Sequence, residues 1–176
     1  TDQPMMKVVD GAGNTTTTLH DESGRVTQIT DPLGRQTNYA YDPDGNLLSH
    51  KDPKGQESRF IYDGKGNLLT ATDPLGHVTA YSYESVANQL ASLTDAAGHT
   101  TFFNHDANAN LVATTHSDGS VERATYDVDG NLESLTDRMG RTIQLRRDAR
   151  GLLTNKIYPD GTALQFTYDS AGSMTH

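Results

Sequence analysis

Two acidic segments of the chain resemble parts of calcium-binding loops. Residues 42–46 read Asp-Pro-Asp-Gly-Asn, and residues 127–131 read Asp-Val-Asp-Gly-Asn. Calcium takes about six to eight oxygen ligands, and a loop of the EF-hand type needs a further Asp and a terminal Glu at fixed spacing. Both segments lack that spacing and that Glu. The residues are therefore better explained as tight turns than as a metal site.

The histidines and serines offer no clearer chemistry. None of the seven histidines stands four residues from another on a predicted helix, and no helix is predicted. His99 and His105 can approach each other across a hairpin, but no further ligands accompany them. The serines lie in turns or strands, without a nucleophile-elbow sequence or a recognisable histidine partner. We predict no metal site, no cofactor and no catalytic residue, and hence a protein that is not an enzyme.

The acidic residues belong to a series of short turns that runs along the whole chain. Turns that open with Asp and close with Gly form two interleaved sets, each repeating every 21 residues, with one inserted residue between Glu84 and Asp95. Asp favours the first position of a type I turn, and Gly supplies the left-handed residue that closes a hairpin. The clearest turn residues are Asp31, Gly34, Asp42, Gly45, Asp52, Gly55, Asp63, Gly66, Asp73, Gly76, Asp127 and Gly130. A fixed period of this kind predicts a repeat architecture.

The segments between the turns have the pattern of β-strands. In residues 37–41, Thr-Asn-Tyr-Ala-Tyr, aromatic side chains alternate with small or polar ones, which is the period of a strand. The aromatic residues that recur in this way are Tyr39, Tyr41, Phe60, Tyr62, Tyr81, Tyr83, Phe103, Tyr126, Phe166 and Tyr168. We predict an all-β fold of tandem β-hairpins, with some sixteen antiparallel strands of about seven residues each.

Such a ribbon is expected to curl, because open twisted sheets rarely exceed about ten strands without doing so. The aromatic residues then form a ladder along one face. This ladder has two readings. It packs neighbouring strands together, or it is exposed and stacks against sugars.

Two local departures from regular strands are predicted. The returning strands open with an aliphatic residue, and a second often follows three positions later, as in Leu132 and Leu135. An offset of three does not fit one face of a regular strand, so we expect a β-bulge there. Residues 84–110 contain the inserted residue and both turns in which Ala replaces Gly. We expect this region to be distorted or more mobile.

Composition alone favours a different answer. Leu, Ile, Val and Phe make up 32 of the 176 residues, and the net charge is −9, a combination typical of disordered chains. The regular turns argue against disorder, and they also account for most of the acidic charge. The chain has no stripe of Lys and Arg, which disfavours nucleic acid as a partner, and no apolar run long enough to span a membrane.

The repeat begins close to the N-terminus, Thr1-Asp2-Gln3-Pro4, which carries no signal peptide, and it continues to His176. We expect residues 1–176 to be a single array of about eight 21-residue repeats from a longer protein. The apolar surface that an isolated piece exposes is expected to cause self-association.

Residues 41–47 and 126–132 resemble the tyrosine-aspartate (YD) repeats of the Rhs family, and residues 31–34 and 73–76 are similar to the second turn of that repeat. The family includes bacterial Rhs and wall-associated polymorphic toxins, the C components of insecticidal toxin complexes, and teneurins. The resemblance implies a β-ribbon that spirals into a hollow shell. In the toxins the shell encloses a C-terminal toxic domain, and in teneurins it belongs to an adhesion ectodomain.

The resemblance also suggests what the chain does. Some toxin relatives cleave themselves at aspartates near Asp-Pro-x-Gly motifs in an Arg-rich core. Here residues 31–34, 52–55 and 73–76 have that motif as ordinary turns, and no such core is present in the sequence, so we assign no autoproteolysis. We expect a structural shell module, secreted or at the cell surface and bacterial rather than animal, whose partners are the enclosed toxin and core segments. The alternative is an adhesion or carbohydrate-binding module.

Overall fold

The structure of the protein is a computed structural model in which residues 4–175 are described, so our expectations about Thr1–Gln3 and His176 lie outside the described residues. Residues 4–175 contain β-strands and turns but no helix. The strands are β1 (Met5–Val9), β2 (Thr15–His20), β3 (Val26–Thr30), β4 (Gln36–Tyr41), β5 (Leu47–Lys51), β6 (Glu57–Tyr62), β7 (Leu68–Thr72), β8 (Val78–Tyr83), β9 (Leu90–Thr94), β10 (Thr100–His105), β11 (Leu111–Thr115), β12 (Val121–Tyr126), β13 (Leu132–Thr136), β14 (Thr142–Arg147), β15 (Leu153–Ile157) and β16 (Ala163–Gln165).

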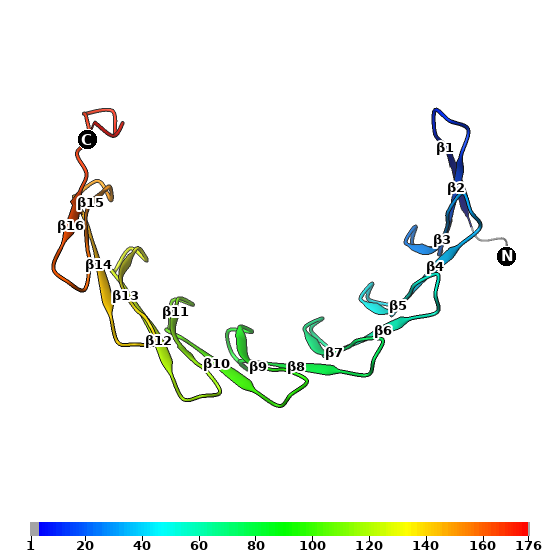
Figure 1. Ribbon diagram of the computed structural model, residues 1–176, viewed down its shortest axis with the longest axis horizontal. Helices are drawn as coiled ribbons and strands as arrows, with labels where there is room; N and C mark the ends of the chain where they lie inside the picture. Colours follow the sequence, from blue (N-terminus) through cyan, green and yellow to red (C-terminus); the bar gives the residue numbers. More distant parts are fainter. Residues whose placement is uncertain (1–3, 176) are drawn as a thin grey trace. The chain divides into compact units, whose positions relative to one another are not determined.

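Each strand lies beside the strands that precede and follow it in sequence, in the order β1 to β16. The backbone divides into two compact units, Thr1–Tyr81 and Ser82–His176. Within each unit the antiparallel ribbon bends progressively along the row of hairpins (Figure 1). The predicted all-β fold of tandem hairpins in a curled ribbon is thus confirmed. That residues 1–176 form a single array of repeats stays a prediction.

The turns take up more of the chain than predicted. In the turn between β4 and β5, the amide of Gly45 donates to the carbonyl of Asp42 at 3.1 Å, and the amide of Asp42 donates to the carbonyl of Asn46 at 3.0 Å. Each turn therefore extends one residue beyond its Gly. The strands are accordingly five or six residues long, apart from the three-residue β16, and not about seven.

The predicted β-bulges are confirmed. Tyr126 on β12 lies opposite Leu132 on β13, but the next pairs are Thr125 with Ser134 and Ala124 with Leu135. Glu133 is therefore the extra residue on β13. A bulge of this kind brings Leu132 and Leu135 to the same face although they are three residues apart. Register shifts at the same place occur between β2 and β3, β4 and β5, β6 and β7, β10 and β11, and β14 and β15.

The irregular turn lies between β8 and β9. Here the amide of Asn88 donates to the carbonyl of Glu84, four residues earlier, at 3.1 Å, and Asn88 takes the left-handed conformation with a φ of 57°. The inserted residue is thus absorbed within the turn. The prediction of a distorted region is wrong for the rest of residues 84–110, because β9 and β10 pair regularly and the turn at residues 106–110 has the usual hydrogen bonds.

Ala109 closes that turn with a φ of 73°, a conformation that glycine adopts without cost, whereas the equivalent Gly130 has a φ of 81° and open space around its missing Cβ. We expect Ala109→Gly to raise the free energy of unfolding by about 1 kcal/mol and Gly130→Ala to lower it by about 1 kcal/mol. Urea unfolding of the two variants measures both changes. Changes of the same sign at the two positions would contradict this account.

The sheet has no conventional core. Among the described residues only Ala113, at 7% exposure, is a buried hydrophobic residue. Strand register assigns the side chains to two faces, because residues directly opposite each other share a face. Tyr39 lies opposite His50 on one face, while the adjacent Asn38 lies opposite Lys51 on the other. We call these the aromatic face and the polar face. Stability in such a single layer comes from contacts between neighbouring hairpins.

Candidate functional site

The eight predicted aromatic residues that lie on strands share the aromatic face within each unit. Tyr39 and Tyr41 lie on β4, and the same two positions on β6 and β8 are also aromatic. In the other unit Phe103 lies on β10 and Tyr126 on β12, whereas Phe166 and Tyr168 come after the end of β16. All ten predicted side chains are half-buried. In contrast, Phe102 points to the polar face and is 52% exposed.

In the first unit the aromatic side chains contact neighbouring strands. The rings of Tyr39 and His50 have centroids 5.2 Å apart in a tilted arrangement. The Arg25 guanidinium lies over the ring of Tyr41 at 5.1 Å. Its Nη1 also donates to the carbonyl of Asp42 at 2.9 Å. Arg25 thereby connects two successive turns across the aromatic face, and the charge over the ring adds a cation–π contribution.

In the second unit two tyrosine hydroxyls are bonded to the preceding hairpin. The hydroxyl of Tyr126 donates to the carbonyl of Leu111 at 3.2 Å, and that of Tyr168 donates to the carbonyl of Leu153 at 2.8 Å. Each tyrosine stands 15 residues after its acceptor, at the equivalent place in its own repeat. These two bonds tie Tyr126 and Tyr168 to the backbone of a neighbouring strand.

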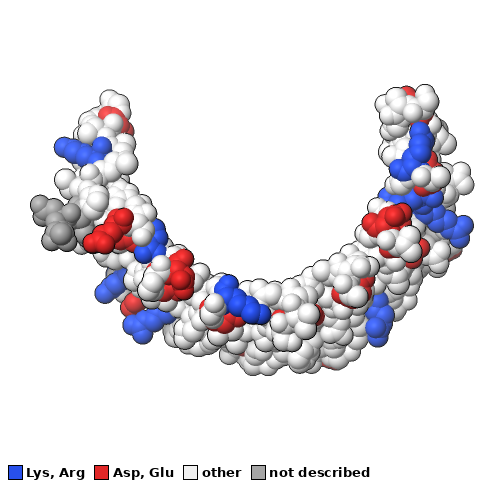
Figure 2. All heavy atoms as spheres, turned by 180° about the vertical axis from the view of Figure 1, so that it is seen from behind, with Lys and Arg blue, Asp and Glu red and all other residues white. Residues whose placement is uncertain are grey.

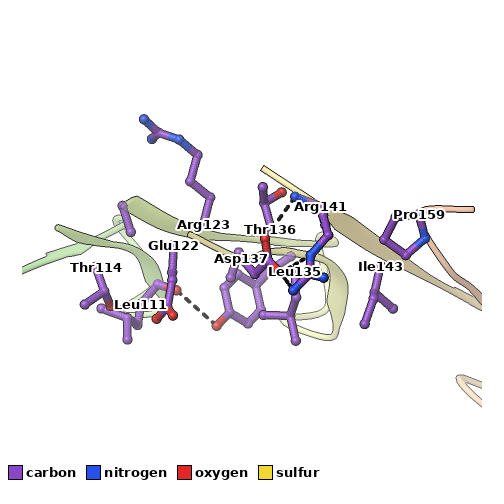
Figure 3. A pocket seen from close by; sticks show the side chains of 13 residues that line it. Leu111, Thr114, Glu122, Arg123, Leu135, Thr136, Asp137, Arg141, Ile143 and Pro159 are labelled. Atoms are coloured by element: carbon purple, nitrogen blue, oxygen red, sulfur yellow. Dashed lines mark hydrogen bonds and ion pairs between the residues drawn. The ribbon is translucent and has the colours of Figure 1, made fainter. Parts of the chain in front are cut away.

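A groove of about 560 Å³ lies over β11 to β14. Leu111, Leu135 and Ile143 form part of its apolar lining together with Tyr126, and Glu122 and Arg141 add charged groups. Figure 3 shows Glu122, Leu135 and Ile143 on one side of the strands and Arg123 projecting from the other. The groove is therefore mainly a feature of the aromatic face. With Leu135 45% exposed, it offers apolar surface to a binding partner.

The turn carboxylates form the second conspicuous set of polar groups. In the turn at residues 42–46, Asp42 Oδ1 accepts from the backbone amide of Asn46 at 2.8 Å, and Oδ2 accepts from the Asn46 side chain at 2.9 Å. The side-chain bond and then the backbone bonds lower the pKa of Asp42 below its usual range. Asp63 has the same arrangement with Asn67, which lowers its pKa in the same way.

The residue after the turn Gly is a functional position that sequence reasoning missed. Its side chain donates to Oδ2 of the turn Asp whether it is Asn46, Arg35 with Asp31 at 2.6 Å, or His77 with Asp73 at 2.8 Å. The available signal was the restriction of this position to side chains with an N–H donor in most repeats. The role of this position depends on the side-chain bond from the fifth residue to the turn Asp, and a turn motif of four residues does not include that fifth residue.

Two turns compensate for the loss of the opening Asp. Residue 116 is His and residue 158 is Tyr, and in these turns the third residue is Asp instead. Asp118 accepts from the backbone and the hydroxyl of Ser120, and Asp160 does the same with Thr162. The hydroxyl bond is the main reason that the pKa of Asp118 is lowered. The two solutions give turns of the same backbone geometry.

The residues weighed as metal ligands take part in these local contacts. Asp127 is bound by Asn131 through backbone and side chain, as Asp42 is by Asn46. His99 contacts Asp95 at 3.1 Å, whereas His105 contacts Glu84 at 3.1 Å, so the two histidines have different partners. Within residues 4–175 no group of three or more potential metal ligands is found.

Charges of both signs are scattered over the surface. Figure 2 shows Lys and Arg beside Asp and Glu as small separate patches on the face that it draws. Some opposite charges form ion pairs, such as Arg141 with Asp137 at 2.7 Å. None of the described residues belongs to a helix that is long and apolar enough to cross a membrane.

A single layer of antiparallel hairpins, repeated every 21 residues and joined by Asp-to-Gly turns, defines a β-hairpin repeat protein. The chain belongs to the RHS Repeat family, which matches it at residues 20–57, 62–100, 126–163 and 147–176. It is thus a structural Rhs repeat module, as the YD motifs indicated.

The hairpin fold is shared with solved structures. The chain is similar to the crystal structures of TcdB2-TccC3-TEV (19% identity, TM-score 0.71) and TcdB2-TccC3-Cdc42 (19%, 0.73), in both cases over 96% of its length. It is also similar to TcdB2-TccC3 without hypervariable C-terminal region, with 20% identity and a TM-score of 0.70 over 92% of its length. It covers 10% of each of those chains. A comparison with curated proteins gave no match.

Proposed function

We propose that this chain is a segment of the wall of an Rhs-type toxin shell, which encloses a C-terminal toxic domain of its parent protein. The observation that carries the proposal is that two tyrosines of the aromatic ladder are hydrogen-bonded to a neighbouring strand, which favours a packing role for the ladder. Tyr126 and Tyr168 donate their hydroxyls to the backbone of the preceding hairpin. Membership of the RHS Repeat family and the fold shared with TcdB2-TccC3 support the same conclusion.

The physical basis of this function is containment without catalysis. Backbone hydrogen bonds join each strand to the next, so the wall has no gaps between strands. At the two edges of the wall, each pair of strands is connected by a hydrogen-bonded turn. We place the apolar aromatic face toward the enclosed toxin and core segments. In this proposal the parent protein is secreted or displayed at a bacterial cell surface, and the wall separates the toxin from the producing cell.

The alternative is a carbohydrate-binding or adhesion module, and the groove on the aromatic face is the observation that favours it. Tyr126 and the aliphatic lining offer an apolar floor to a sugar ring, while Glu122 and Arg141 offer hydrogen-bonding groups to its hydroxyls. Aromatic stacking combined with polar groups of this kind is a usual arrangement in small-molecule sites.

Protease protection of the parent protein tests the proposal. The parent reading frame is expressed with its C-terminal segment, and digestion of that segment is compared with digestion of the same segment expressed alone. Protection by the repeats supports the wall. Equal digestion of the two would contradict enclosure.

Binding to a glycan array tests the alternative on the 176-residue chain. Sugar binding that is lost in Tyr126→Ala and retained in Phe102→Ala would favour the carbohydrate-binding module, because only Tyr126 lines the groove. Absence of binding, together with protection of the C-terminal segment, favours the shell.

A further inference from the structure

The irregular turn at residues 84–89 contains two departures from the repeat that contact each other. It belongs to the set of eight turns that begin at residues 21, 42, 63, 84, 106, 127, 148 and 169, of which seven open with Asp and this one opens with Glu84. The residue before the next turn is Tyr in five repeats, including Tyr41 and Tyr126, but here it is His105. Nδ1 of His105 lies 3.1 Å from Oε1 of Glu84.

This contact replaces the tyrosine bond found in other repeats. Tyr126 donates its hydroxyl to a backbone carbonyl of the preceding hairpin. His105 instead reaches a carboxylate at the turn of the preceding hairpin. The backbone carbonyl cannot titrate, and a phenol keeps its proton at neutral pH, whereas a histidine changes its charge between about pH 5 and pH 8.

His105 is the basic residue whose side chain is seen to contact the Glu84 carboxylate. The His105 side chain is 12% exposed and that of Glu84 is 34% exposed, so solvent screens the pair only in part. Asp106 is a further charged residue near the ring, and the residue opposite on β11 is Leu111.

We infer that Glu84 and His105 form a pH-sensitive latch, which holds the irregular turn to the next hairpin more tightly as the pH falls from about 8 to about 5. At the higher pH the pair is a hydrogen bond between a carboxylate and a neutral ring. Protonation of the ring makes it a charge-assisted bond, which is about twice as strong.

Hydrogen exchange of the 176-residue chain tests the latch at the two backbone amides whose hydrogen bonds close the turn. The amide of Glu84 donates to the carbonyl of Gln89, and the amide of Asn88 donates to the carbonyl of Glu84. After correction for intrinsic exchange, we expect their protection to rise about three- to tenfold from pH 7.5 to pH 5.5. The amides of Asp127 and Gly130 serve as internal controls and should change little. They lie in a regular turn, and in the repeat that follows it the position of His105 is occupied by Arg147.

Two variants separate the latch from a general effect of pH. His105→Tyr restores the residue found at this position in five repeats, so the hairpin should still fold, and Glu84→Gln keeps a hydrogen-bond acceptor without charge. Each should remove the pH dependence of protection in the turn. A flat response in the native chain, or an unchanged response in His105→Tyr, would overturn the inference.

Discussion

Replacing Phe103 by Ala is expected to lower the free energy of unfolding by about 2 kcal/mol, and replacing its neighbour Phe102 by about 0.5 kcal/mol or less. Truncation of a fully buried Phe typically costs about 3–5 kcal/mol, and Phe103 is half-buried on the aromatic face opposite Thr114. Phe102 is 52% exposed on the polar face, where substitutions have small effects.

The pair is a matched test because the two residues are chemically identical and adjacent on β10. Urea unfolding followed by circular dichroism gives both free energies. If the ladder exists for a ligand and not for packing, Phe103→Ala would leave stability nearly unchanged. Equal losses at both positions would mean that the strand, and not its aromatic face, responds to the change.

Acid is expected to unfold the chain cooperatively, with stability falling as the pH drops through about 4 and continuing to fall below it. Hydrogen bonds from the backbone and from the residue after the turn Gly lower the pKa of the turn carboxylates. Because these pKa values are lower in the folded than in the unfolded chain, the stabilisation is complete above the unfolded values. It is lost as the pH falls through the folded ones.

The effect should be large because the same contribution recurs along the array. The aspartates with a lowered pKa are Asp10, Asp21, Asp31, Asp42, Asp63, Asp73, Asp95, Asp106, Asp118, Asp127, Asp137, Asp148 and Asp160. Each protonation weakens a different turn, and in a repeat protein these local losses accumulate.

Urea midpoints measured from pH 2 to pH 7 check this expectation. Asp42→Asn combined with Asp63→Asn removes two titrating turns, so the variant should be less stable at pH 7 and show a shallower fall below pH 4. Repeating the series in about 1 M salt controls for general charge repulsion, which is largely screened at that concentration. An identical pH dependence in the native chain and the variant would contradict the role of the turn carboxylates.

The local features of this protein could be predicted from its sequence. A turn that opens with Asp42 and closes with Gly45 is decided by residues within the turn, so its position needs no knowledge of the rest of the fold. The alternation of Tyr39 and Tyr41 with small residues likewise assigns the strand and its two faces. The offset of Leu132 and Leu135 predicted the bulge, because only an extra residue puts both side chains on one face.

The contacts between hairpins were decided by the tertiary structure. Tyr126 donates to the carbonyl of Leu111, 15 residues earlier in the chain, and His105 contacts Glu84, 21 residues earlier. These contacts depend on the register and bend of successive hairpins, which no turn motif specifies. For the same reason the groove between Leu111 and Ile143 could not be located from the sequence, since it exists only where four strands lie side by side.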